Sequence, residues 1–351
     1  MKGQMETRAS RLRASLVVLL AVAAVVAAVP AFAEPDNSYT VHPLVSNVSG
    51  AAVHLDPNLV NAWGLTAGPT SPWWVADNGT DLSTLYGADG TPRSLVVQVP
   101  GGPTGAVFWS ATARAIFVFA TEAGQIRGWH PSQGNQTVVL ADRSGFGAIY
   151  KGLAFASTPA GNLFYAADFH NAHVDVFDST FTLVSHPGEF VDSQLPDGYA
   201  PFGIQTIGSR IFVTYAKQDE AAHDEVAGQS LGFVDAYDTA GNLLVRVAQH
   251  GQLNAPWGLA LAPSDFGSFS GDLLVGNFGD GQINAYEELA NGHFEHRGEL
   301  RTADGKSLTI DGLWALQFGR GAPNNGATNT LFFTAGPNEE SDGLFGSITS
   351  P

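Results

Sequence analysis

The sequence predicts an all-β fold, a six-bladed β-propeller. A short apolar strand that opens with glycine recurs six times, and two further short strands follow it each time. Each run is too short for a helix and is bounded by Gly, Pro, Asn or Asp. A spare strand near the N-terminus and 41 glycines for tight turns complete the pattern, which is typical of a repeated blade.

The opening strands set the period of the repeat. Their glycines are 41, 47, 51, 55 and 54 residues apart, which suits one four-stranded blade per repeat. The six openers are Trp63-Gly64-Leu65, Thr104-Gly105-Ala106, Lys151-Gly152-Leu153, Phe202-Gly203-Ile204, Trp257-Gly258-Leu259 and Asp311-Gly312-Leu313.

The second and third strands of each blade follow as further apolar runs. Second strands are expected at 73–76, 115–120, 163–167, 211–215, 273–276 and 331–335. Third strands are expected at 83–86, 125–129, 173–177, 233–237, 282–286 and 344–348. An antiparallel meander is therefore the unit of the fold.

Outer strands are expected in only five units, at 94–99, 137–141, 182–186, 243–248 and 296–301. The sixth unit has none, while residues 39–46 form an alternating strand without a unit of its own. If this strand pairs with 344–348, the ring closes and its exposed sheet edges disappear. The alternative is an open sandwich, but that fold does not require the same three-strand sequence pattern to occur six times.

The first 33 residues have the pattern of a signal peptide. Arg8, Arg11 and Arg13 precede an apolar run at 16–29, and Ala31-Phe32-Ala33 is a small-x-small cleavage site. The alternative is a membrane anchor, but the run is shorter than the ~20 residues that a span needs. We therefore expect a single domain over 34–351, exported to the periplasm or the extracellular space, with no membrane span after cleavage.

The charge of the chain is strongly acidic. Its 16 basic and 33 acidic residues fall to 12 and 32 without residues 1–33, a net charge of −20. Such a field disfavours nucleic acid and anionic lipid and tolerates cations, although solubility alone also explains it. The chain has no cysteine, which excludes thiol catalysis and thiolate metal sites. We expect a monomer.

The repeat resembles known propeller sequences. The phrase from Pro256 to Tyr286 and the run Trp73-Trp74-Val75-Ala76-Asp77-Asn78-Gly79 look like NHL-type repeats. Residues 58–65, 215–219 and 223–228 resemble an uncharacterised family of exported bacterial propellers, often ending in a PEP-CTERM sorting tail. The resemblance implies the fold and export but no reaction, and the sorting tail is absent at Pro351.

One face of the ring is expected to bind ligands. In each blade, the loop after the second strand and the loop leading into the first strand share this face. The candidate ligand-face residues are Asn61, Trp63, Lys151, Asp219, His223, Asp224, Trp257, Asp311 and Asn338. The insertion at 217–232 is the longest of these loops and predicts a lid or metal-binding flap, with a solvated acidic loop as the alternative.

The same face offers oxygen ligands for a cation. The candidate metal ligands are Asp77, Asn78, Glu122, Asp168 and Asn277. Ca²⁺ is the ion that best suits such carboxylate and amide oxygens, so it is the cofactor to consider, although none is certain. Asp and Asn are also the ordinary residues of tight turns, and no contiguous calcium loop is present.

Two residues are candidates for a catalytic role. Asp168 and His170 are the candidates, because an imidazole beside a carboxylate can act as a general base near neutral pH. The chain has no Gly-x-Ser-x-Gly elbow, no His-Glu-x-x-His motif and no Walker loop. Trp63 and Trp257 are expected to wedge between blades near the channel rather than to stack a sugar.

Two classes of function remain open. The first is a secreted scaffold that binds an extracellular ligand or protein through the acidic, Asn-rich face. The alternative is a Ca²⁺-dependent hydrolase like the six-bladed lactonases and esterases, in which the metal polarises a carbonyl and Asp168 or His170 handles the proton. A third possible function is that of a purely structural envelope protein.

Overall fold

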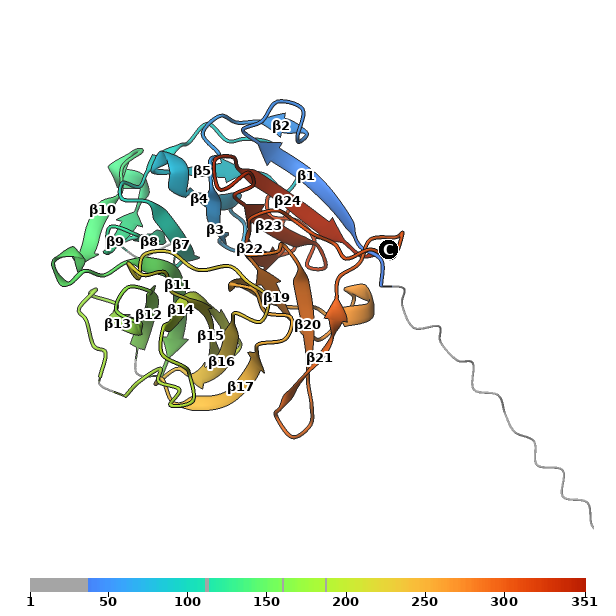
Figure 1. The fold of residues 1–351 in the computed structure, drawn as a ribbon. Helices are drawn as coiled ribbons and strands as arrows, with labels where there is room; N and C mark the ends of the chain where they lie inside the picture. The colour runs from blue at the N-terminus through green and yellow to red at the C-terminus, as the bar shows by residue number, and fades with distance from the viewer. Residues whose placement is uncertain (1–36, 111–113, 160, 187) are drawn as a thin grey trace, which may run out of the picture. The chain divides into compact units, whose positions relative to one another are not determined.

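A computed structural model gives the structure of the chain and describes residues 37–110, 114–159, 161–186 and 188–351. These residues form six antiparallel sheets arranged around a ring, which confirms the six-bladed β-propeller (Figure 1). Short 3-10 turns are the only helices in the described part, and none of them could cross a membrane. The expected signal peptide at 1–33 lies outside the described residues.

The blades follow one another along the chain. The first has β3 (Ala62–Thr66), β4 (Trp73–Asp77), β5 (Leu82–Tyr86) and β6 (Val97–Gln98). The second has β7 (Pro103–Phe108), β8 (Phe117–Thr121), β9 (Gln125–Trp129) and β10 (Val138–Asp142), and the third has β11 (Tyr150–Thr158), β12 (Gly161–Asp168) and β13 (His173–Asp178).

The second half of the ring repeats this order. The fourth blade has β14 (Tyr199–Ile207), β15 (Arg210–Lys217), β16 (Phe233–Asp238) and β17 (Leu243–Gln249). The fifth has β18 (Pro256–Leu261), β19 (Leu273–Asn277), β20 (Ile283–Glu288) and β21 (Phe294–Glu299), and the sixth has β22 (Leu313–Phe318), β23 (Leu331–Ala335) and β24 (Leu344–Thr349).

The N-terminal strand closes the ring as expected. β1 (Thr40–Ser46) pairs antiparallel with β24, with Thr40 opposite Thr349 and Val45 opposite Phe345 (Figure 1). A short strand that the sequence did not predict, β2 (His54–Leu55), adds to β1 in parallel. The sixth sheet therefore has the order β2-β1-β24-β23-β22.

Two expectations about the strands are wrong in detail. The outer strand at 182–186 is not formed: the third sheet has three strands, and the segment attaches through a bridge between Phe177 and Leu183. The glycine that opens the sixth blade is also misplaced. Leu313 pairs with Ala335 as Ala62 pairs with Asp77, so Ala315, and not Gly312, holds the position of Gly64.

The opening glycines are required where neighbouring inner strands meet. A Cβ atom on Gly203 would lie 2.1 Å from the backbone oxygen of Trp257, and one on Gly64 would lie 2.2 Å from that of Thr104. Real Cβ atoms do not approach backbone oxygen so closely. The repeated glycine thus sets how tightly the inner strands approach one another around the ring.

Each inner strand also carries an irregularity at the same place. Register shifts occur next to the opening glycine in the first five blades and next to Ala315 in the sixth, for example between Ala62 and Leu65 and between Pro201 and Ile204. A β-bulge re-aims the side chain beside it. The residue before each glycine therefore lies at a distorted point of its strand.

Candidate functional site

Six residues, one from each inner strand, occupy equivalent positions around the ring axis. By strand register they are Trp63, Thr104, Lys151, Phe202, Trp257 and Trp314. Four are aromatic and one is charged. Their composition decides what the centre of the propeller can do.

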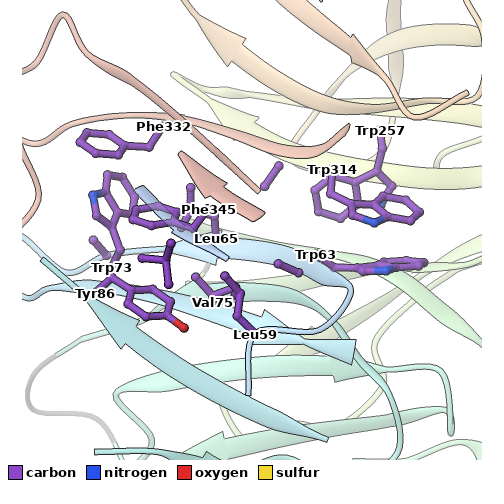
Figure 2. Packing of buried hydrophobic residues seen from close by; sticks show 14 of the residues in the cluster. Leu59, Trp63, Leu65, Trp73, Val75, Tyr86, Trp257, Trp314, Phe332 and Phe345 are labelled. Atoms are coloured by element: carbon purple, nitrogen blue, oxygen red, sulfur yellow. The ribbon is translucent and has the colours of Figure 1, made fainter. Parts of the chain in front are cut away.

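The aromatic members close the centre of the ring. Trp63 stacks on Trp314 with ring centroids 3.7 Å apart, and Trp257 meets both edge-on at 6.3 and 5.8 Å. Phe278 stacks on the other face of this group, 4.1 Å from Trp314. Figure 2 shows Trp63, Trp257 and Trp314 gathered together, apart from the group around Trp73. We call Trp63, Phe202, Trp257, Phe278 and Trp314 the aromatic plug.

Hydrogen bonds fix the plug to its surroundings. The indole Nε1 of Trp257 donates to the backbone oxygen of Lys151 at 2.9 Å, and that of Trp314 donates to Oδ1 of Asn61 at 3.0 Å. The expectation that the tryptophans wedge between blades near the axis therefore agrees with their contacts. Trp63 and Trp314 are buried.

Lys151 is the charged member of the set and is only 1% exposed. Its ammonium donates hydrogen bonds to Glu122 and, at 3.0 Å, to Asp224, and it lies 5.1 Å from the ring centre of Trp63. The ammonium thus contacts two carboxylates and one aromatic face, and groups of these kinds also bind free organic cations.

Amide groups extend this cluster toward the first and sixth blades. Nδ2 of Asn61 donates to Asn78 at 3.2 Å and to Glu340 at 2.5 Å, and Nδ2 of Asn78 donates to Glu122 at 2.8 Å. Asn61 itself has a positive φ of 46°, which aims its side chain from a tight turn. We call Asn61, Asn78, Glu122, Lys151, Asp224, Glu225 and Glu340 the acidic mouth.

The charges of the acidic mouth shift one another's pKa values. Burial opposes the ammonium of Lys151, but Glu122, Glu225 and Asp224 outweigh it and raise its pKa. Burial raises the pKa of Glu225 to about 8, with Glu340 and Asp224 adding repulsion and Lys151 opposing it. Burial likewise raises the pKa of Glu340. Acidic groups are thus in excess over the single cation.

The insertion at 217–232 supplies two of these acids. It folds into a small hairpin, in which Gln218 bridges Glu225 and the Asp219 amide donates to the Asp224 carbonyl at 2.8 Å. Gln218 also donates to the backbone of Phe169 at 2.6 Å, and a His170 ring nitrogen lies 3.1 Å from the Ala222 oxygen. The insertion is therefore attached to the third blade beside the axis.

The five candidate metal ligands are divided among separate networks. Asn78 and Glu122 belong to the acidic mouth. Asp77 is fully buried and accepts from the Thr84 amide at 2.9 Å, whereas Asn277 donates to Gln252 and Asp280 at 2.7 and 3.1 Å. Burial raises the pKa of Asp77 well above its usual range. Asp77 and Asn277 therefore bond within their own networks and do not extend the acidic mouth.

Two clusters among the described residues bring three acidic or imidazole atoms within 4.8 Å of one another. They are Glu122 with His223 and Asp224, and Asp168 with His173 and Asp175. In the first, Glu122 and Asp224 already bind the ammonium of Lys151. A metal ion there would have to displace an ammonium that is tethered to the chain.

The second cluster contains the catalytic candidate Asp168. Its imidazole neighbour is His173, 3.7 Å away, and not His170, whose ring contacts the insertion. Asp175 contacts the other side, with His173 at 3.0 Å and the Tyr150 hydroxyl donating to it at 2.6 Å. Two buried carboxylates thus hold one half-exposed imidazole, whose pKa Asp175 raises most.

The remaining ligand-face candidates serve local turns. Asp311 accepts from the Asn338 amide at 2.9 Å, and Asn338 donates to Asp342 at 3.2 Å. Asp219 accepts from the His223 amide at 2.8 Å. Glu225 and Glu340 lie in the acidic loops expected on the ligand face but were not singled out there, and Phe202 was missed. The acidic residues in the same loops were a signal for Glu225 and Glu340, and the position before Gly203 was one for Phe202.

Comparison with known sequences identifies viral relatives. "Uncharacterized protein R648" of Acanthamoeba polyphaga mimivirus is 32% identical over 338 residues, covering 89% of this chain and 80% of that protein. "Uncharacterized protein L690" of the same virus is 31% identical over 339 residues, covering 89% and 86%. No model of a known protein family matches the chain. A link to bacterial PEP-CTERM proteins stays a prediction.

Comparison with solved structures returns β-propellers and other proteins at low identity. A protein of unknown function from Bacteroides thetaiotaomicron superposes with a TM-score of 0.57 at 11% identity, over 89% of this chain and 76% of that one. A streptogramin B lyase gives 0.52 at 11%, over 89% and 98%. The PQQ-bound aldose sugar dehydrogenase of Streptomyces coelicolor gives 0.51 at 13%, over 90% and 99%. At such identities the likeness shows the fold alone.

Proposed function

The chain belongs to the same protein family as these two uncharacterized mimivirus proteins, and we propose that it is an exported, monomeric propeller that binds a cationic group at its acidic mouth. The group would be an ammonium or guanidinium of an extracellular ligand or protein. The observation that carries this proposal is that the mouth already binds one cation, the ammonium of Lys151, by its carboxylates.

The charge balance of the mouth supports a second cation. Glu122, Asp224, Glu225 and Glu340 surround a single ammonium. A bound cation would offset the repulsion among these acids, which adds to burial in raising the pKa of Glu225 and Glu340. The excess of acids over the whole chain would steer such a ligand toward the surface.

Titration calorimetry of the full chain tests the proposal. The probes are n-butylammonium and n-butylguanidinium, with n-butanol as the neutral control. We expect the two cations to bind and n-butanol not to bind, and we expect Glu340→Gln to weaken cation binding at least fivefold. Glu295→Gln, an exposed change of equal charge on β21, is the matched control. Equal binding of all three probes would refute the proposal.

The Ca²⁺-dependent hydrolase is a second candidate because Glu122, His223 and Asp224 approach one another closely enough to share a metal. The ammonium of Lys151 argues against a calcium site, because it already forms ion pairs with the carboxylate oxygens of Glu122 and Asp224. If Ca²⁺ binds, Glu122 and Asp224 would hold it and the ion would supply Lewis-acid polarisation of a carbonyl. Calorimetry with CaCl₂ separates the two candidates: tight Ca²⁺ binding by the wild-type chain would favour the hydrolase.

A further inference from the structure

The inner strands lead from the acidic mouth to a second opening of the ring. Asn61 and Lys151 lie at or near the starts of β3 and β11, whereas Thr66, Phe108 and Thr206 lie at or near the ends of β3, β7 and β14. The latter residues line a cavity of about 280 Å³. We call this cavity the far hollow, and its position at the strand ends separates it from the site of the proposed function.

The far hollow is lined by polar side chains that lack partners. Arg320, Gln205 and Gln317 all face it, and their side chains make no hydrogen bond or ion pair within the described ranges. The hydroxyl of Thr206, which also lines the hollow, is buried and has no partner there either. Buried polar atoms are usually satisfied, so the unpartnered hydroxyl of Thr206, beside three further polar side chains that water reaches, points to a bound molecule.

Arg320 stands out by its charge. Every other arginine in the described part of the chain has a hydrogen bond, an ion pair or both, for example Arg210 with Glu288 and Arg246 with Asp235. The chain has 33 acidic residues for 16 basic ones, so carboxylate partners are abundant. A guanidinium without one beside a cavity is available to a ligand.

Aromatic side chains form another wall of the far hollow. Phe108, Trp109 and Phe155 line it. Trp109 is held edge-on by Phe164 at 5.2 Å and by Phe181 at 5.8 Å, and Phe155 lies 5.1 Å from Phe164. The wall is therefore preformed, and it can cover the apolar body of a small ligand.

A second, smaller cavity lies next to the far hollow. It has a volume of about 20 Å³, lies between all six inner strands beside Trp257, and shares Gln205 and Gln317 with the far hollow. It has room for one or two water molecules. Because the aromatic plug lies beyond it, a molecule in the far hollow is separated from the acidic mouth.

We propose that the far hollow binds a small organic monocarboxylate, with Arg320 as the charged partner, the amides of Gln205 and Gln317 as further polar partners, and the aromatic wall around its apolar part. The planar guanidinium matches a carboxylate in two parallel hydrogen bonds. The acidic field of the chain disfavours anions of higher charge, so one carboxylate is the charge that this site accepts.

Ligand-detected NMR and calorimetry on the full chain test the proposal with phenylacetate and its neutral analogue phenylacetamide. We expect phenylacetate to bind at least tenfold more tightly than phenylacetamide. The variant Arg320→Gln should remove this preference while keeping the melting temperature, because Arg320 is exposed and has no partner to lose. The matched control is Lys306→Gln, which removes one exposed charge that does not line the far hollow and should bind phenylacetate like the wild type.

Three results would overturn the proposal: no binding of phenylacetate at 10 mM, equal binding of the two probes, or an equal loss in Arg320→Gln and Lys306→Gln. The last result would mean that net charge, and not a site, governs the binding. The probes carry no cationic group, so either outcome is independent of the acidic mouth.

Discussion

The ammonium of Lys151 lies 3.0 Å from the carboxylate of Asp224, 73 positions further along the chain. This contact joins the inner strand of the third blade to the insertion of the fourth. Since Lys151 is buried while Asp224 is exposed, the pair links the interior of the ring to its surface. The insertion is therefore a part of the acidic mouth rather than a separate solvated loop.

Replacing Lys151 with methionine should destabilise the protein and tighten its binding of external cations. Glu122 and Asp224 lose their cation, and breaking one side of a buried pair costs about 3–5 kcal/mol. Both acids keep some access to water, so we expect about 1–3 kcal/mol in urea denaturation. Calorimetry should show n-butylammonium binding more tightly than to the wild type.

The matched control for this prediction is Lys306→Met. Lys306 is 80% exposed and pairs with the exposed Asp304, so its loss should change stability by less than about 1 kcal/mol. A Lys151→Met protein that is as stable as this control and gains no cation affinity would contradict the charge balance described for the mouth.

Glu225 should make stability fall as pH rises. Burial raises its pKa to about 8, from an ordinary value of 4.5. Between these two values the folded protein keeps a proton that the unfolded chain has lost, so the free energy of unfolding decreases with pH across that window. Glu225→Gln removes this contribution and should be more stable than the wild type at pH 9, but not at pH 4.

Denaturation at pH 4, 6, 8 and 9 checks this expectation, with Glu295→Gln as the control. Glu295 is exposed, and its variant should follow the wild-type pH profile. Parallel profiles for Glu225→Gln and the wild type would show that Glu225 ionises as an ordinary surface acid.

Gly203→Ala should destabilise the ring. The added methyl group would lie 2.1 Å from the Trp257 oxygen, and overpacking of this kind costs about 1–3 kcal/mol or more. Gly145→Ala is the control, because its Cβ would meet nothing within 4 Å. Thermal melting should separate the two variants, and equal melting temperatures would mean that the inner strands can move apart.

A disulfide across the closing strands should stabilise the propeller. Thr40 and Thr349 are direct partners on β1 and β24, and the chain has no cysteine to compete with a pair placed there. We expect Thr40→Cys with Thr349→Cys to raise stability by about 2–4 kcal/mol. The gain should disappear under reducing conditions; a gain that persists with reductant would have another cause.

The fold was predictable because the sequence pattern of the inner strands recurs at a regular spacing. Glycines such as Gly64 and Gly203 recur where backbones approach closely, and this constraint is visible in the sequence. Gly312 was wrongly assigned to the start of the sixth inner strand, because residue type alone does not distinguish a glycine in a turn from one at a close backbone contact. In the structure Ala315 holds the position that corresponds to Gly64. The outer segment at 182–186 was overpredicted because an edge has a neighbour on one side only.

The site was less predictable because it depends on contacts between blades. Loop positions indicated which residues share a face, and the structure brings Lys151 and Asp224 together there. The pairing of His173 with Asp175, and of Asn61 with Glu340, depends on side-chain directions that spacing does not give. Arg320 went unnoticed because the lack of a partner is visible only once all neighbours are known.

The contact between β1 and β24 also has a consequence in time. His42 on β1 bonds to Thr349, 307 positions later. At roughly 5–20 residues per second of synthesis, β1 waits tens of seconds before its partner strand exists. During that delay the edge of β1 is free to pair with other chains. We therefore expect a chaperone that binds nascent chains to improve the yield of this protein. The improvement should be larger than for propellers in which all strands of the closing blade are neighbours in the sequence.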